Sequence, residues 1–137
     1  MADDVLLNKA ATIERCVARA REEYDKGPET FGEDFTRQDA AILNLQRACQ
    51  SALDMGQYLV RREGLGLPQS AREVFDLLAA AGILPADLAA AMKRMVGFRN
   101  IAVHEYQKVQ LPITVAIITQ HLGEFLAFAK VVLAYPA

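Results

Sequence analysis

The sequence predicts an all-α fold, an up-and-down bundle of four to five helices. Almost every long segment repeats its apolar residues at the helical spacing of three and four, and almost none alternates them as a strand would. The composition agrees, because 53% of the 137 residues are apolar and 23% are charged, with only eight glycines and five prolines. A chain of this length can bury roughly two-thirds of its unfolded surface without help from a disulfide or a metal. We therefore expect a single domain over residues 1–137.

The first helix is predicted from the apolar residues between Leu6 and Tyr24, which follow one another at steps of four and three. Gly27-Pro28 ends this helix, because proline cannot continue it. Phe31 and Phe35 lie in the polar linker that follows. We expect both rings to fold back over the core.

The second helix is predicted to begin at Thr36, with Asp39 three residues later as its capping partner, and to end near Arg62. Its apolar residues cover a broad face rather than a narrow stripe. A face of that width is typical of a central helix with neighbours on two sides.

Three further helices are predicted from the residues that start and stop them. Residues 70–73 form a capping box that opens the third helix, and Gly82 closes it. Pro85 and Pro112 are expected at the first positions of the fourth and the last helix. The apolar stripe of the last helix consists of Ile118, Leu122, Phe125, Ala129 and Val132.

Charge and cysteine content exclude several classes of function. A net charge of −2 and a pI near 5.7 argue against a protein that coats nucleic acid non-specifically, so any polyanion must meet a local basic site. Cys16 and Cys49 form no CxxC pair, which excludes a zinc knuckle and a secreted disulfide framework, and we interpret both as buried, unreactive thiols. His121 has no partner at metal-ligand spacing and is interpreted as a structural or surface histidine. We expect no metal and no cofactor.

No targeting or membrane segment is expected either. The opening residues MADDVLLNKA are acidic where a secretory signal would be basic. The longest apolar stretch, residues 111–134, is interrupted by Gln120, His121, Glu124 and Lys130, and we expect it to be too polar to span a bilayer. The sequence therefore predicts a cytoplasmic protein with no membrane partner.

Polar functional groups concentrate near the end of the fourth helix, where its pattern should be burying surface. On a helical wheel, Arg99 lies within about 40° of Leu88 and Met95, in the middle of the apolar stripe. A guanidinium cannot be neutralised, so in that position it needs a carboxylate, a phosphate or a wet interface.

The neighbouring residues extend this cluster. If the helix continues, Asn100, His104 and Tyr106 fan out with Arg99 over an arc of about 160°, and Tyr106 lies about 20° from Arg99. Such a cluster can be a hydrogen-bond network that closes a helix end. It can equally be an active site in which Arg99 holds a phosphate, His104 moves a proton near neutral pH and Asn100 orients them.

Arginine and histidine without clustered carboxylates fit metal-independent phosphodiester chemistry better than two-metal chemistry. One arginine and one histidine are few catalytic groups for a complete active site. A two-fold dimer would bring two copies of Arg99 and His104 together around one cleft.

The string RNIAVHEY, residues 99–106, resembles the R-x4-H-x-Y motif of HepT-type proteins. These are small all-helical members of the HEPN superfamily, encoded beside MNT-type minimal nucleotidyltransferases. The blocks DDVLLNKAATIERC, DFTRQDAAILNLQRACQSALD and GLPQSAREVFDLLAAAGIL follow in the expected order, so the resemblance extends from about residue 3 to about residue 130. R-x4-H alone is a weak pattern, and Asn100, Tyr106 and the flanking blocks make it specific.

This resemblance implies a HEPN-like fold and a homodimeric, metal-independent endoribonuclease, the toxin of a toxin–antitoxin pair. Arg99 would bind and polarise the scissile phosphate. His104 would act as general base or acid on the ribose 2′-hydroxyl and the leaving oxygen, and Asn100 would help to position them. The antitoxin, an MNT-type nucleotidyltransferase, would silence the enzyme by transferring AMP to Tyr106. The RNA substrate, tRNA or mRNA, is left open.

Two other classes of function remain open at this point. One is a non-catalytic helical module that binds a nucleotide or a partner enzyme through Arg99. The other is a dimerisation scaffold that needs neither Arg99 nor His104.

Several charged residues near the motif can each be interpreted in two ways. Lys93, Arg94 and Lys108 can track RNA phosphates or can simply solvate the surface. Asp39 and Arg47 on the second helix are candidate supporting or groove residues.

Overall fold

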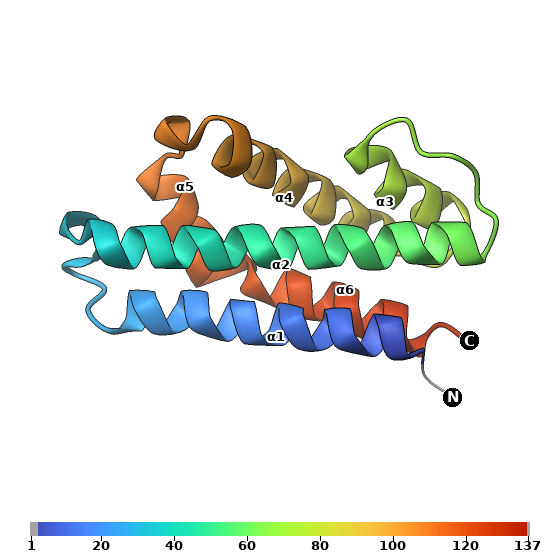
Figure 1. Ribbon diagram of the computed structural model, residues 1–137, viewed down its shortest axis with the longest axis horizontal. Helices are drawn as coiled ribbons and strands as arrows, with labels where there is room; N and C mark the ends of the chain where they lie inside the picture. The colour runs from blue at the N-terminus through green and yellow to red at the C-terminus, as the bar shows by residue number, and fades with distance from the viewer. Residues whose placement is uncertain (1–2, 137) are drawn as a thin grey trace.

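The protein is a bundle of helices in this computed structural model, which describes residues 3–136 (Figure 1). Its helices are α1 (Asp4–Asp25), α2 (Phe35–Arg62), α3 (Ala71–Ala80), α4 (Ala86–His104), α5 (Leu111–Ala116) and α6 (Leu122–Ala134). The short elements are the 3-10 turns η1 (Phe31–Glu33) and η2 (Tyr106–Lys108) and a π-helical segment, η3 (Ile117–His121). The described residues contain no strand, so the predicted all-α class is confirmed.

The long helix α2 lies at the centre of the bundle. It packs against α1, α3, α4 and α6, as its broad apolar face predicted. The start of α1 and the end of α6 lie at one end of the bundle, which we call the terminal end (Figure 1). The start of α2 and the end of α4 lie together at the opposite end, which we call the motif end (Figure 1).

One hydrophobic core runs through the described residues. The predicted stripe of the last helix contributes Ile118, Phe125, Ala129 and Val132 to it, all buried. Phe128 is buried too, and its ring meets that of Phe75 edge-on with centroids 5.5 Å apart.

The expectation that residues 111–134 are too polar to cross a bilayer is not supported. By length and composition alone, Leu111–Ala134 could span a membrane. That is weak support for a membrane helix, because the core helix of a soluble bundle meets the same criteria. In this chain one face of the segment packs into the core.

The prediction that Thr36 caps α2 was wrong. Asp34 is the capping residue, and its carboxylate accepts a hydrogen bond from the Arg37 amide at 3.0 Å. A capping carboxylate satisfies an amide that has no partner inside the helix. Asp39 therefore takes no part in capping, and its carboxylate makes a different contact at the motif end.

The linker phenylalanines behave differently from each other. Phe31 is buried and packs edge-on against Tyr24, with ring centroids 5.2 Å apart, as predicted. Phe35 is 75% exposed, so the prediction that it folds back over the core was wrong. Because Asp34 caps the helix, α2 begins at Phe35, one residue before Thr36, and Phe35 lies on its exposed side.

The later caps mostly follow the prediction. The Ser70 hydroxyl accepts from the Glu73 amide at 3.2 Å, and Gly82 has a φ of +76°, in the left-handed region that glycine tolerates. Pro85 occupies the cap position of α4 instead of its first helical residue. The last helix is not continuous, because η3 interrupts it between α5 and α6. The apolar spacing alone does not reveal a π-helical insertion.

Candidate active site

Arg99 is half-buried near the end of α4 and faces α2. Its Nε and Nη2 atoms both donate to Gln50 Oε1, at 3.2 and 2.7 Å, and its Nη1 donates to Asn100 Oδ1 at 2.8 Å. Both partners are neutral amides, and no ion pair within residues 3–136 involves Arg99. The guanidinium is therefore held in place without being neutralised. Three of its five N–H groups are engaged, and two remain for a ligand.

Gln50 is a supporting residue that the sequence did not suggest. Its Nε2 donates to Asp54 Oδ1 at 2.9 Å, and Lys9 Nζ lies 3.1 Å from Asp54 Oδ2. These contacts connect Arg99 through α2 to α1. A charged residue at this position of α2 would have suggested a partner for Arg99. A single glutamine on a face of mixed polar and apolar residues does not.

The two cysteines are buried free thiols, as expected. Cys49 lies under the motif, with its Sγ 3.5 Å from the carbonyl oxygen of Met95. Burial raises the pKa of the Cys49 thiol to about 12, against a smaller opposing effect of Arg99. Burial also raises the pKa of Cys16. Both thiols therefore stay protonated at neutral pH.

His104 is the last residue of α4 and is exposed. The helix stops there because Glu105 has φ −143° and ψ 54°, outside the helical region. Within the described chain, no hydrogen bond joins the His104 ring to Arg99, Asn100 or Tyr106. Arg99 and His104 leave α4 about 140° apart around its axis, so one chain does not bring them together.

The prediction that the helix continues through Tyr106 was wrong. Tyr106 begins the turn η2, in which the Lys108 amide donates to the Glu105 carbonyl at 2.8 Å. The Tyr106 hydroxyl donates to Asp39 Oδ1 at the start of α2, and the side chain remains 42% exposed. Partial burial and then the bond to Asp39 raise the pKa of Tyr106 to about 12.

The anchors of Arg99 and Tyr106 are well separated. Asp39 and Gln50 lie on one face of α2, about three turns and about 16 Å apart. Tyr106 and Arg99 therefore do not lie about 20° apart on a single helix, as expected. They contact α2 at two positions that are separated along its axis. Asp39, a candidate supporting residue, contacts Tyr106 rather than Arg99.

The remaining basic candidates divide into paired and unpaired side chains. Lys93 Nζ lies 2.9 Å from Asp76 Oδ1 on α3. Lys108 forms an exposed pair with Glu105 at 3.2 Å. Arg47 and Arg94 are exposed, and neither forms an ion pair with a residue of the described chain. Arg94 and Lys108 line a cavity beside the motif, while Arg47 lies outside it.

Comparison with known proteins identifies the family. The family described as Ribonuclease HepT-like matches residues 13–132 of the chain. The mRNA nuclease HepT of Shewanella oneidensis is 44% identical over 132 residues, which cover 96% of this chain and 98% of that protein.

Solved structures of toxin–antitoxin complexes match the fold. The tri-AMPylated HEPN toxin of Shewanella oneidensis, in complex with its MNT antitoxin, is 44% identical with a TM-score of 0.90, over 95% of this chain and 97% of that chain. A chain from a toxin–antitoxin complex with AMP-PNP is 42% identical with a TM-score of 0.90, over 95% of this chain and 98% of that chain. The predicted family is thus confirmed, and the chain belongs to the HepT-like ribonuclease family.

Proposed function

We propose that the chain is the ribonuclease toxin of a toxin–antitoxin pair and that it cleaves RNA with Arg99 and His104, without a metal. The observation that carries this proposal is the setting of Arg99, whose guanidinium is fixed by two neutral amides and keeps its charge and two N–H groups for a phosphate. A purely structural arginine at that depth would be expected to pair with a carboxylate. Membership of a ribonuclease family supports the same reading.

The reaction needs two proton transfers and the stabilisation of developing charge. His104 removes the proton of a ribose 2′-hydroxyl while that oxygen attacks the adjacent phosphorus. The bond from phosphorus to the 5′ oxygen breaks, that oxygen receives a proton from protonated His104, and a 2′,3′-cyclic phosphate remains. Arg99 binds the non-bridging oxygens on which negative charge develops. Asn100 orients the guanidinium through its bond to Nη1.

We infer that the working enzyme is a two-fold homodimer. Because Arg99 and His104 diverge by about 140° around α4, one chain does not direct both at a single phosphate. A two-fold axis beside α4 would set side chains of two copies around one cleft. Val103 lies between the two in helical phase and is 44% exposed, and such an interface would cover it.

We propose that an MNT-type nucleotidyltransferase silences the enzyme by transferring AMP from ATP to Tyr106. The phenolic oxygen bonds to the α-phosphorus, pyrophosphate leaves, and the phenolic proton passes to a base. With its pKa raised to about 12, the phenol is a poor nucleophile near pH 7 and depends on activation by the partner. Asp39 already accepts the phenolic hydrogen bond and is the nearest acceptor for that proton. The tri-AMPylated Shewanella toxin supports this mode of control.

AMP transfer would rearrange the contacts of Tyr106. The phosphodiester carries a negative charge and has no O–H to donate, so the carboxylate of Asp39 would repel it. His104, two residues away along the chain, is the group that a first AMP unit covers. Arg99 is anchored about 16 Å further along α2, too far for a single AMP unit on Tyr106 to cover its guanidinium directly.

The decisive assay is RNA cleavage in EDTA by the wild type and by His104→Ala. We expect the wild type to cut and to leave a cyclic phosphate or 3′-phosphate end, and the variant to lose at least about 10²-fold in rate. Arg61→Ala, an exposed arginine at the terminal end, is the control. Full loss of wild-type cleavage in EDTA, or undiminished cleavage by His104→Ala, would contradict the mechanism. RNA binding without any cleavage would favour the non-catalytic binding module.

The substrate and the compartment follow from the same reasoning. The name of the Shewanella relative, an mRNA nuclease, favours messenger RNA over transfer RNA. RNA and the ATP used for silencing meet in the cytoplasm, and we propose that this protein acts there.

A further inference from the structure

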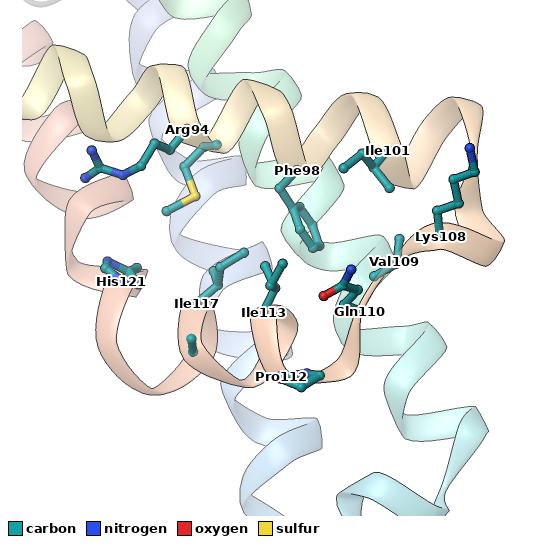
Figure 2. A pocket seen from close by; sticks show the side chains of 12 residues that line it. Arg94, Phe98, Ile101, Lys108, Val109, Gln110, Pro112, Ile113, Ile117 and His121 are labelled. Atoms are coloured by element: carbon teal, nitrogen blue, oxygen red, sulfur yellow. The ribbon is translucent and has the colours of Figure 1, made fainter.

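A cavity of about 450 Å³ lies between the second half of α4 and the segment formed by α5 and η3 (Figure 2). Its volume falls in the range of about 300–1,000 Å³ that is typical of small-molecule sites. The walls are mainly apolar, and Phe98 points into the space between the two helical segments (Figure 2). The other apolar side chains that matter below are Ile101, Val109, Ile113 and Ile117.

The ionisable side chains that line this cavity are all basic, and two of them, Lys108 and His121, pair with glutamates outside the lining. Arg94 and His121 lie at one end and Lys108 lies at the other (Figure 2). Among residues 3–136, no carboxylate lines the cavity, although the whole chain carries a net charge of −2. The ion pair of Lys108 with Glu105 is exposed and easily exchanged for another anion. The cavity is therefore complementary to an anion with an apolar body.

The π-helical segment η3 shapes one wall. It contributes Ile117 and His121 to the cavity, and its Ile118 carbonyl accepts a hydrogen bond from Arg21 Nη1 at 3.2 Å. His121 Nδ1 lies 3.0 Å from Glu124 Oε1, which fixes the imidazole and leaves Nε2 for another partner. Interruptions of this kind within α-helices are frequent at functional sites.

The cavity adjoins the motif. Ile101 lines it and precedes His104 by three residues, a spacing at which Cβ atoms on a helix are about 5–6 Å apart. Lys108 and Val109, at its other edge, directly follow the turn that begins with Tyr106. An RNA strand lying on His104 would pass the mouth of this cavity.

We propose that the cavity receives one nucleobase of the RNA strand beside the scissile phosphate, with Arg94 and Lys108 binding the flanking phosphates. The proposal rests on the ribonuclease function proposed above. Single-stranded RNA is commonly recognised by unstacked bases that enter pockets and pack on aromatic rings, and Phe98 offers such a ring. Gln110 supplies a neutral amide, which can donate to and accept from the edge of a base.

The test is the binding of ribonucleoside 5′-monophosphates at millimolar concentration to the full chain, followed by NMR of the isoleucine methyl groups. We expect AMP, GMP, CMP or UMP to shift the signals of Ile101, Ile113 and Ile117, and inorganic phosphate alone to leave them in place. Arg94→Ala should weaken binding about tenfold, because it removes a charge-assisted contact. Arg61→Ala, at the terminal end, should bind like the wild type.

Two variants change the cavity itself. Ala116→Leu adds volume to the lining and should abolish the methyl shifts. Gln110 is exposed, so Gln110→Ala should not disturb the core. This variant should change which nucleotide binds best and which base is found beside the cleavage site. Absence of shifts with all four nucleotides, or unchanged shifts in Ala116→Leu, would overturn the proposal. A changed molar mass of Ala116→Leu in light scattering would also overturn it, because the cavity would then be an interface between copies.

These outcomes separate the cavity from the nuclease. Nucleotide binding without RNA cleavage would refute the proposed function and leave the cavity as a nucleotide site. Cleavage with an unaltered base preference in Gln110→Ala and no nucleotide binding would refute the cavity and leave the nuclease.

Discussion

Two tyrosines at opposite ends of α2 donate the same kind of hydrogen bond to an aspartate. At the terminal end Tyr58 donates to Asp3, and at the motif end Tyr106 donates to Asp39. The two contacts differ in the groups that surround each carboxylate. The contact of Asp3 stabilises the fold, whereas that of Asp39 positions the side chain that we propose to be modified.

The Asp3 carboxylate belongs to a network. It caps α1 by accepting from the Val5 amide at 2.9 Å, and Arg62 Nη1 lies 3.7 Å away. Arg62 also donates to the Pro136 carbonyl at 3.0 Å, which ties the C-terminal segment to α2. The bond to Tyr58 is the main cause that lowers the pKa of Asp3. Several contacts therefore stabilise the terminal end together.

The Asp39 carboxylate has a simpler environment. Tyr106 is its partner, and no ion pair within residues 3–136 involves Asp39. Tyr106 lies on a 3-10 turn outside the main helices and is 42% exposed. Such a contact can open without loosening the core, which suits the presentation of Tyr106 to another enzyme that we propose.

The largest expected effect contrasts two arginines. Arg99→Ala should lower RNA cleavage by about 10²–10³-fold, because it removes the group that stabilises developing charge, and should leave the helical content intact. Arg62→Ala should leave cleavage unchanged and lower the free energy of unfolding by about 1 kcal/mol through its lost hydrogen bonds. Cleavage assays and denaturant unfolding of both variants check this. Equal cleavage by Arg99→Ala and the wild type would end the assignment.

The second contrast is between the tyrosines. Tyr106→Phe should keep cleaving RNA and escape silencing by the partner, because it has no oxygen to accept AMP. Tyr58→Phe should be silenced normally and should unfold at a slightly lower denaturant concentration, because it loses its hydrogen bond to Asp3. The measurements are growth of cells that carry the partner, and chemical unfolding of each variant. Silencing of Tyr106→Phe as complete as that of the wild type would contradict the assignment.

The fold was predictable because it depends on apolar spacing along whole helices, which still indicates the helices when a single cap is misplaced. Apolar spacing and capping residues located every helix to within a few residues. They misplaced the start of α2, because Asp34 competes with Thr36 as the cap. They also missed η3, since a π-helical insertion leaves the composition unchanged.

The sequence alone was enough to name candidate site residues, but it did not predict their geometry. Arg99 and His104 stood out because charged groups interrupt an apolar face, and the family resemblance assigned Tyr106. The helical wheel failed beyond His104, because Glu105 leaves the helical region. Gln50, on a helix far away in sequence, gave no local signal of its contact with Arg99.

A smaller effect concerns pH. The bond to Asp3 raises the pKa of Tyr58, and partial burial followed by the bond to Asp39 raises the pKa of Tyr106 to about 12. Both phenols bind their protons more tightly in the folded chain, so their contribution to stability is complete below pH about 10 and is lost as the pH rises through the folded pKa. Asp39→Asn should lower the pKa of Tyr106 toward its ordinary value, and titration of tyrosinate absorbance measures the change. An unchanged titration curve would show that Asp39 does not act on the phenol.

The smallest effect concerns the buried thiols between the two ends. With the pKa of Cys49 raised to about 12 and that of Cys16 also raised, neither should react with a thiol reagent in the native chain near pH 8. Both should react after unfolding in denaturant, which is the control. Rapid labelling of Cys49 in the native chain would mean that the region beneath Arg99 opens.

The most direct test of the contrast between the two tyrosines is peptide mapping after incubation of the chain with its partner nucleotidyltransferase and ATP. Trypsin cuts after Arg99 and Lys108, so residues 100–108 form a peptide in which Tyr106 is the only one of the four tyrosines. We expect AMP mass increments on this peptide alone, rising in parallel with the loss of RNA cleavage. AMP on Tyr24, Tyr58 or Tyr135, or loss of cleavage with Tyr106 unmodified, would contradict the assignment of the motif end as the controlled site.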